Sequence, residues 1–242
     1  MTFWRNVRWL LRGELRRIGF GFLWTMIMMV YFAFFGGTML FRYIGSAEHK
    51  EYVFTNVMID FIFLTSVGMM GFAFSKDYLK YWKNNRLSSK MKYYKSLPIS
   101  SEEIVVCRQL TLFITTVFSG LVFFISLYLM TDYVRTAFEP LEYVAFALAW
   151  TGYSLILASF FLYVELGYKE KIYFIISCSS ILLYMGVPVL LWLLDAHAVQ
   201  SSIRVVKETG FVLPAITLLL GAASQLLLKK FAVTKLNRRN LT

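Results

Sequence analysis

The mostly apolar stretch 53–75 contains an amide and a carboxylate, Asn56 and Asp60, which are the side chains best placed for chemistry. Asn56 and Asp60 are four residues apart, so a helix would place them on one face. A carboxylate near the centre of a bilayer costs about 2.5–3.5 kcal/mol, which favours a position facing the protein interior or water. Alternatively, the helix is shifted inward, with the aromatic residues at 78–82 as its inner belt and Asp60 at the outer interface. The sequence leaves both positions open.

A second polar row lies in the apolar stretch 172–194. Ser177, Ser180 and Tyr184 recur at helical spacing and share one face. Pro188 follows one turn later. Because a proline inside a helix removes a backbone hydrogen bond, we expect a kink or a break there.

Motifs for catalysis, nucleotide binding and metal binding are missing from the chain. It contains no phosphate-binding G-x-x-x-x-G-K-[ST] loop, no HExxH and no GxSxG. The two histidines, His49 and His197, fall in predicted outer loops, and Cys107 and Cys178 form no CxxC pattern. The sequence therefore predicts neither an enzyme nor a metal site.

The apolar residues are divided into runs of membrane-spanning length. The chain has 242 residues, of which 58% are hydrophobic, and a mean hydropathy of +0.61. Runs of about 20 residues match a hydrocarbon core of about 30 Å. The sequence predicts an all-α integral membrane protein, a single domain over 1–242, with six transmembrane helices. The runs lie near 19–41, 53–75, 105–131, 143–164, 172–194 and 210–228.

The basic residues are distributed unevenly between the two sides of these runs. Both termini, the loop after the second run and the turn after the fourth hold 19 Lys and Arg, whereas the three opposite connections hold 5. The positive-inside rule therefore predicts that both termini are cytoplasmic. Anionic headgroups account for the net charge of +11, so we expect the lipid bilayer and no nucleic acid as a partner. In the turn between the fourth and fifth apolar runs, Glu165 and Lys169 are four residues apart, at helical pairing distance.

The first 18 residues have the pattern of an amphipathic helix. One face carries a row of four arginines, and the other face is apolar. Such a helix is typical of the inner leaflet, and we expect an interfacial helix over 1–18. A plain basic flank to the first span is the alternative. The arginines are Arg5, Arg8, Arg12 and Arg16, and the apolar residues are Phe3, Val7, Leu10, Leu11 and Ile18.

The longest polar interval, 76–103, leads into the third apolar run. Ser100 and Glu103 form a capping-box pattern, with Ile99 positioned to pack against Ile104. The third helix is therefore expected to start at Ser101 and to run to about Met130. Thirty residues extend about 45 Å, so this helix would protrude from the bilayer and could transmit a displacement from the loop.

With this layout, the segment KSLPISSEEIVVCRQL resembles the start of the third helix in permease subunits of ATP-binding-cassette exporters of the type-2 permease family. In that family, two six-span permease subunits pair as a homo- or heterodimer, and each binds a cytoplasmic ABC ATPase subunit. The resemblance implies no cofactor in this chain, with ATP and Mg on the partner ATPase. It also implies a protein of the cell membrane, with N- and C-termini cytoplasmic.

The resemblance assigns residues to two functions. A coupling helix for the ATPase would fall within 84–98, with apolar anchors ringed by lysines, as suits a protein interface. The alternative places these tyrosines at the lipid headgroups. The substrate path would be lined by the second and fifth spans. The coupling residues are Lys90, Lys92, Tyr93, Tyr94, Lys95, Leu97 and Pro98, and the path residues are Asn56, Asp60, Ser177, Ser180 and Tyr184.

The expected function is the permease subunit of an ABC exporter that moves an apolar or amphipathic solute out of the cytoplasm by alternating access. Two other classes compete with it. One is a six-span membrane scaffold or immunity protein that transports nothing. The other is a secondary transporter that uses Asp60 as its coupling carboxylate.

Overall fold

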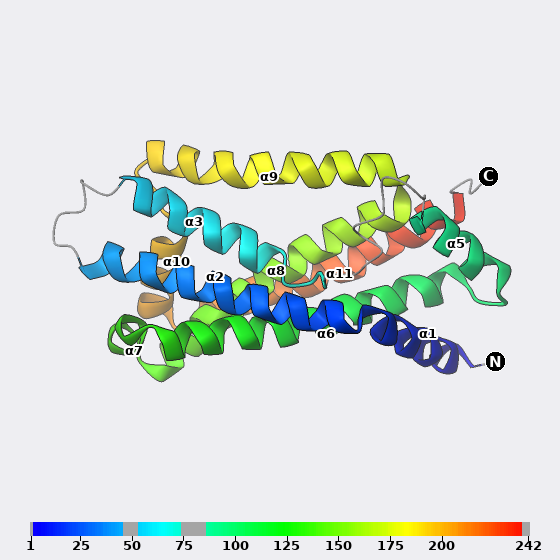
Figure 1. The fold of residues 1–242 in the computed structure, drawn as a ribbon, viewed down its shortest axis with the longest axis horizontal. Helices are drawn as coiled ribbons and strands as arrows, with labels where there is room; N and C mark the ends of the chain where they lie inside the picture. The colour runs from blue at the N-terminus through cyan, green and yellow to red at the C-terminus, as the bar shows by residue number, and fades with distance from the viewer. Residues whose placement is uncertain (1, 46–52, 74–85, 239–242) are drawn as a thin grey trace.

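The computed structural model describes residues 2–45, 53–73 and 86–238, and within these ranges the regular structure is entirely helical (Figure 1). The first part of the predicted coupling loop, 76–85, and the predicted aromatic belt at 78–82 lie outside the described residues. The start of α1 and the end of α11 lie at the same end of the bundle as α5 (Figure 1). We call this end the inner end, and the end with α7 and α10 the outer end. The helices are α1 (Phe3–Ile18), α2 (Phe20–Gly45), α3 (Val53–Gly68), α5 (Arg86–Ser96), α6 (Ser101–Met130), α7 (Asp132–Ala137), α8 (Pro140–Gly167), α9 (Glu170–Leu193), α10 (Ala198–Thr209) and α11 (Val212–Arg238).

Five helices within the described residues are long and apolar enough to cross a membrane, namely α2, α6, α8, α9 and α11. The predicted second span is shorter than expected, because α3 ends at Gly68 rather than near residue 75. Its 16 residues extend only about 24 Å. The chain continues through turns at 69–71, where Thr115 of α6 donates a 2.6 Å hydrogen bond to the carbonyl of Gly71. Non-helical backbone is tolerated at membrane depth when the protein itself satisfies it.

The predicted start of the third helix is confirmed. α6 covers Ser101–Met130, and Ser100 and Glu103 form the reciprocal capping box. Glu103 accepts a 2.7 Å bond from the Ser100 N–H, and its own N–H donates to Ser100 Oγ. Of the kink or break predicted at Pro188, a break is ruled out, because α9 continues through this residue to Leu193.

Together, α1 and α2 follow α6 along almost its whole length. Near the inner end, Asn6 donates a 2.9 Å hydrogen bond to Glu103. Further along, the rings of Phe22 and Phe118 lie 6.1 Å apart. The number of residues between the contacting positions is nearly the same for both pairs, so α1 and α2 run parallel to α6. The apolar stripe of α1, which the sequence analysis assigned to the inner leaflet, packs against Cys107 and its neighbours on α6.

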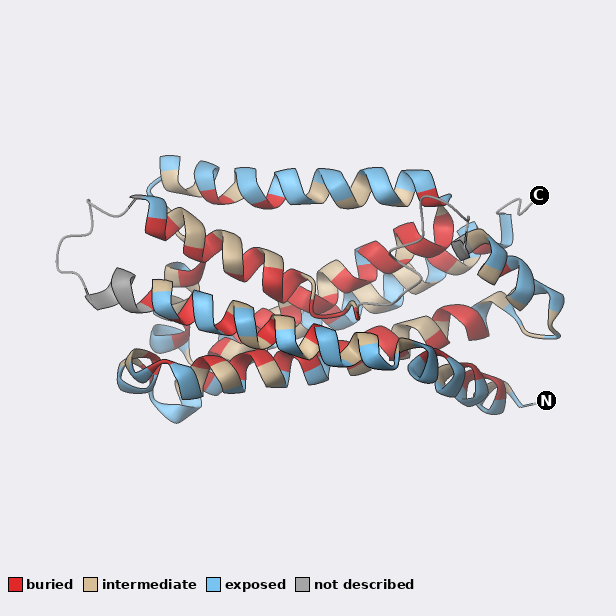
Figure 2. Cartoon of the chain, in the orientation of Figure 1, coloured by how far each residue is buried: buried red, intermediate tan, exposed pale blue. Residues whose placement is uncertain are grey.

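The main core cluster lies between α2, α3, α6 and α8, whereas α9 leaves most of its surface exposed (Figure 2). Phe63 of α3 stands at the centre of an aromatic cluster with Phe123, Phe146 and Trp150. On the other side of α8, Gly152 brings this helix into close contact with α11. A Cβ atom at Gly152 would lie 2.5 Å from the backbone of Thr217. The bundle is therefore tight around α8 and α11 and open at α9.

This difference gives a matched pair of substitutions. Gly152→Ala should destabilise the protein by about 1–3 kcal/mol, since it forces the α8 and α11 backbones apart. Gly186→Ala on α9, where a Cβ meets nothing within 4 Å, should be neutral or stabilising by about 0.5–1 kcal/mol. Thermal unfolding of both variants in the same detergent measures the difference. Equal melting temperatures would contradict the close α8–α11 contact.

Candidate functional site

At the inner end, α5 is attached to α1 through a buried carboxylate. Glu14 of α1 is only 6% exposed. Lys90 donates to Glu14 Oε2 at 2.8 Å and lies 2.6 Å from Oε1. The hydroxyl of Tyr94 also donates to Glu14 Oε1. Two of the predicted coupling residues therefore face into the protein.

The charges around Glu14 keep it ionised. Burial by itself raises the pKa of this carboxyl. The positive charges of Lys90 and Arg108 and the hydrogen bonds from Lys90 and Tyr94 together lower the pKa by more than burial raises it, so the net pKa is below its ordinary value. The pKa of Tyr94 is raised, first by burial and then by the negative charge of Glu14. At neutral pH, a charged carboxylate thus faces an ammonium and a protonated phenol.

A second buried pair joins two of the long helices beside this contact. Arg108 of α6 donates to Glu165 Oε2 of α8 from Nε at 3.2 Å and from Nη2 at 3.0 Å. Local spacing pairs Glu165 with Lys169, whereas in the structure Glu165 accepts from Arg108, 57 residues away in the chain. Breaking a buried ion pair is costly, at about 3–5 kcal/mol, because the remaining charge loses its compensation. The pair therefore fixes α6 relative to α8 close to Glu14.

Further polar contacts connect α5 to the remaining inner ends. The hydroxyl of Ser88 donates to Glu170 at the start of α9, at 3.1 Å. Lys95 donates to the carbonyl of Leu236 near the end of α11, at 2.8 Å. Met91 is buried among residues of α6, α8 and α11. The α5 helix is thus held by α1, α9 and α11 at once.

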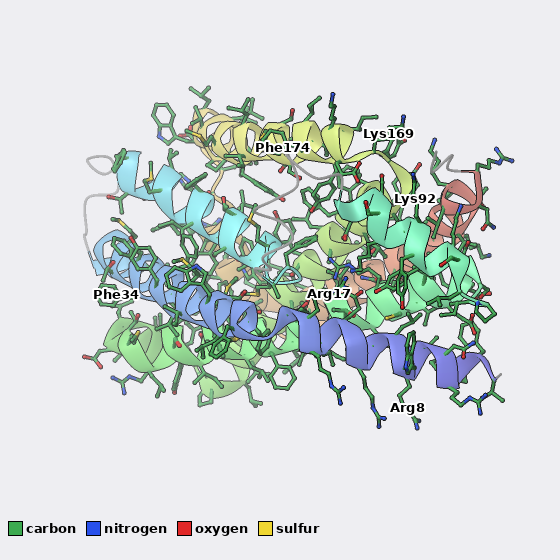
Figure 3. The ribbon with its side chains drawn as sticks, turned by 45° about the vertical axis from the view of Figure 1, so that its right-hand side comes forward. Arg8, Arg17, Phe34, Lys92, Lys169 and Phe174 are labelled. Atoms are coloured by element: carbon green, nitrogen blue, oxygen red, sulfur yellow. The ribbon has the colours of Figure 1, made fainter. Side chains whose placement is uncertain are left out.

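The predicted coupling residues fall into two groups. Lys90, Tyr94 and Leu97 are half-buried. Lys92, Tyr93, Lys95 and Pro98 are exposed, although the ammonium group of Lys95 donates a hydrogen bond to the carbonyl of Leu236. Figure 3 shows the position of Lys92 on α5. An approaching protein would meet Lys92, Tyr93 and Pro98, and not Tyr94.

The inner contact should respond to acid and to neutralisation of Glu14. Its lowered pKa means that the carboxylate stabilises the fold fully above the ordinary value of 4.5 and that this contribution is lost as the pH falls through the lower, folded value. Glu14→Gln should remove the contribution at pH 7 and increase hydrogen exchange in α5 at least tenfold, because Lys90 then lacks a counter-charge. Glu142→Gln, in the first turn of α8, is the control. Unchanged exchange in α5 for Glu14→Gln would refute the attachment.

At the outer end, Asp60 caps another helix. Its side chain is 1% exposed, and its two oxygens accept hydrogen bonds of 2.9 Å each from the backbone N–H groups of Ala198 and Val199. These groups form the N-terminus of α10, where the helix dipole favours negative charge. His197 Nδ1 lies 4.0 Å from the same carboxylate. Asp60 is thus buried in the bundle, and α10 satisfies it.

Asn56 and Asp60 share a small cavity between α3 and α10. The cavity is also lined by His197 and Gln200. Asn56 Oδ1 is buried and has no hydrogen-bond partner among the described residues. The structure therefore brings these two predicted path residues together.

The three predicted path residues on α9 do not reach this cavity. Tyr184 is buried, and its hydroxyl lies beside Gly68, where a Cβ would be 3.4 Å away. Ser177 and Ser180 are half-buried, and Ser180 donates within its own helix to the carbonyl of Ser177 at 2.7 Å. The two helices that carry the five residues, α3 and α9, lie side by side (Figure 1), and Tyr184 lies at their contact.

Sequence reasoning missed Glu14, Arg108 and Glu165 as site residues. For Glu14 a signal exists, because it follows Leu10 by four residues and therefore lies on the apolar face of α1. A single acidic residue on that face needs a buried partner. For Arg108 and Glu165, which are far apart in the chain, no local pattern indicates the pairing.

The role of Asp60 can be tested by removing its charge. Asp60→Asn keeps the size of the side chain but places an amide donor opposite two N–H donors, so it should cost about 1.5–3 kcal/mol. Hydrogen exchange at 198–209 should rise, and the melting temperature should fall. Asp132→Asn at the exposed start of α7 is the control. Unchanged exchange in α10 would show that Asp60 does not hold this helix.

The chain matches no protein-family model, no curated protein and no solved structure. Within the described residues, no group of three or more His, Cys, Asp and Glu side chains could hold a metal ion. The geometry provides attachment: α5 is fixed to α1, α9 and α11 at the inner end, and α10 is fixed to α3 at the outer end.

Proposed function

We propose that this chain is the permease subunit of an ABC exporter, which moves an apolar or amphipathic solute outward and is driven by a separate cytoplasmic ATPase subunit. The observation that carries the proposal is the attachment of α5. This helix leads directly into α6. Its face toward the bundle binds Glu14, Glu170 and the carbonyl of Leu236, and its opposite face leaves Lys92 and Tyr93 exposed.

A force applied to α5 would reach several helices together. Because Lys90 and Tyr94 hold a buried carboxylate, α5 cannot move away from α1 without exposing or uncoupling that charge. Its hydrogen bonds to Glu170 of α9 and to the Leu236 carbonyl of α11 likewise oppose movement of α5 away from those two helices. ATP binding on the partner would shift α5, and the long α6 would transmit the shift through the bundle, giving alternating access.

The open side of the bundle suits the path and the second subunit. α9 presents large apolar side chains such as Leu182, Leu190 and Leu193 and is held mainly by α3. In the proposal, this side faces a second permease subunit or lipid, and the solute passes between the subunits along α3 and α9. The bilayer is that of the cell membrane, with both termini in the cytoplasm.

The two competing functions make different demands on the same residues. A secondary transporter needs Asp60 to exchange a proton or an ion, whereas both of its oxygens are bonded to the N-terminus of α10, which favours a structural role. A scaffold needs no transport at all. Transport that persists without ATP and follows a proton gradient would favour the transporter, and the absence of both transport and an ATPase partner would favour the scaffold.

The proposal is tested most simply on α5. Tyr93→Glu and Lys92→Glu should weaken ATPase association about tenfold or more, because they place negative charge in the exposed face of α5 and leave the residues that bond to α1, α9 and α11 unchanged. Tyr133→Glu, on α7 at the outer end, is the matched control. Co-purification of the ATPase and ATP-dependent transport in proteoliposomes are the measurements. Full association of the ATPase with the Tyr93→Glu, Lys92→Glu double variant would remove the coupling assignment.

A further inference from the structure

Two serines face each other between α6 and α8 in the interior of the bundle. Arg108 of α6 bonds to Glu165 of α8, and this pair fixes the relative height of the two antiparallel helices. Ser119 lies 11 residues beyond Arg108, and Ser154 lies 11 residues before Glu165. Because that spacing is about three helical turns, each serine lies on the same face of its helix as the charged residue. Ser119 and Ser154 are therefore at the same level on opposite sides of the contact.

These two serines and Thr116 carry buried hydroxyls. The three side chains are 0% exposed, and none of the three hydroxyl oxygens has a hydrogen-bond partner among the described residues. Buried polar groups are almost always hydrogen-bonded, and an unpaired one is costly. A serine inside a helix commonly bonds to the carbonyl four residues earlier, as Ser159 does to Leu155. The three hydroxyls do not use this local solution, which indicates that they bind something else.

The turn that follows α3 lies against the same part of the contact between α6 and α8. A Cβ atom at Gly71 would lie 3.2 Å from Thr116 Oγ1 and 3.0 Å from Ala158 Cβ. Ala158 is four residues, or about one turn, from Ser154 on α8. The backbone of this turn therefore lies close to the unpaired hydroxyls.

The end of α3 brings negative partial charge to this region. α3 ends at Gly68 and has no basic residue in its last turn. The carbonyls of a last helical turn have no partner within the helix, and the helix dipole makes this end negative. The donors that the structure provides here are neutral hydroxyls, from Tyr153 to the Leu64 carbonyl and from Thr115 to the Gly71 carbonyl. The region thus combines hydroxyl oxygens, carbonyl oxygens and a negative helix end.

We propose that Thr116, Ser119 and Ser154 bind a small monovalent cation, together with carbonyl oxygens at the end of α3. Ligand sets made only of oxygen are typical of hard cations. Sites for Mg²⁺ and Ca²⁺ contain carboxylates, and this ligand set has none, so a single positive charge fits best. Interrupted membrane helices bind Na⁺ through their freed carbonyls in the same way.

The bound cation would join the non-helical segment after α3 to both α6 and α8. Such a site uses no His, Cys, Asp or Glu side chain, so it agrees with the finding that the described residues contain no cluster of these types for a metal ion. The role of the cation is structural, since it compensates the end of a short helix. The inference therefore stands independently of the proposed function.

The test uses the full chain in detergent, with sodium compared with choline at constant ionic strength. Radioactive sodium should bind with one ion per chain. Since a ligand that binds only the folded state stabilises it, the melting temperature of the wild type should be higher in sodium than in choline. The expected difference is about 5 °C or more at a sodium concentration about 100 times the Kd.

Two serine-to-alanine double variants provide a matched comparison. The Ser119→Ala, Ser154→Ala variant should lose the sodium dependence. It should melt at or above the wild type in choline, because it removes two unpaired buried hydroxyls, and below the wild type in sodium. The Ser159→Ala, Ser224→Ala variant removes two hydroxyls that bond to each other at 3.1 Å, and it should keep the full sodium dependence.

Three outcomes would overturn the inference. The first is a wild type that binds no sodium and melts alike in both salts, a result that can be read even if the double variant fails to fold. The second is a Ser119→Ala, Ser154→Ala variant that melts below the wild type by the same amount in both salts, which would assign the hydroxyls to buried water. The third is a sodium dependence that this variant retains, which would place the ion elsewhere. All three leave ATPase association, the test of the proposed function, unaffected.

Discussion

The inner end of the bundle depends on the burial of Glu14 together with its partners. A carboxylate with 6% exposure is tolerated only while Lys90 and Tyr94 are in place. The same condition applies to Arg108 and Glu165 one layer deeper. Moving either partner out of these contacts is costly, since an isolated buried charge costs several kcal/mol. The position of α5 is therefore determined by its contacts with α1, α9 and α11, and a short polar helix becomes part of the same rigid end as the long apolar ones.

The two ends of the bundle solve the problem of a buried carboxylate differently. Glu14 is neutralised by a side-chain cation, whereas Asp60 is satisfied by the backbone N–H groups of α10. Between them, α3 is short, and its non-helical continuation is held by Thr115. α9 is packed mainly against this interrupted helix. A bundle that is firmly joined at α3, α6 and α8 and loosely joined at α9 has an evident place for movement at α9, and this supports the proposed path along α3 and α9.

The sequence predicts what depends on local spacing and fails where the partner is distant in the chain. The capping box at Ser100 and the course of α6 follow from adjacent residues, and the structure confirms them. The end of α3 was predicted too late, because hydropathy counts apolar residues and cannot foresee that Thr115 will satisfy a turn at Gly71. The apolar stripe of α1 suits a leaflet or a protein equally well, and only the contact with α6 distinguishes them. Likewise, Asp60 could be recognised as unusual from the sequence, but the helix that caps it begins 138 residues later.

The most direct test of this account is the side of the membrane on which α5 lies. A cysteine introduced at Ser89, an exposed position of α5, in a chain whose Cys107 and Cys178 are replaced by serine, can be labelled with a membrane-impermeant maleimide in oriented vesicles. The account predicts labelling only when the cytoplasmic face is accessible, and the opposite result for a cysteine at Glu139, before α8. Labelling of position 89 from outside intact cells would place the anchored helix where no ATPase can reach it, and would contradict both the topology and the drive from the cytoplasm.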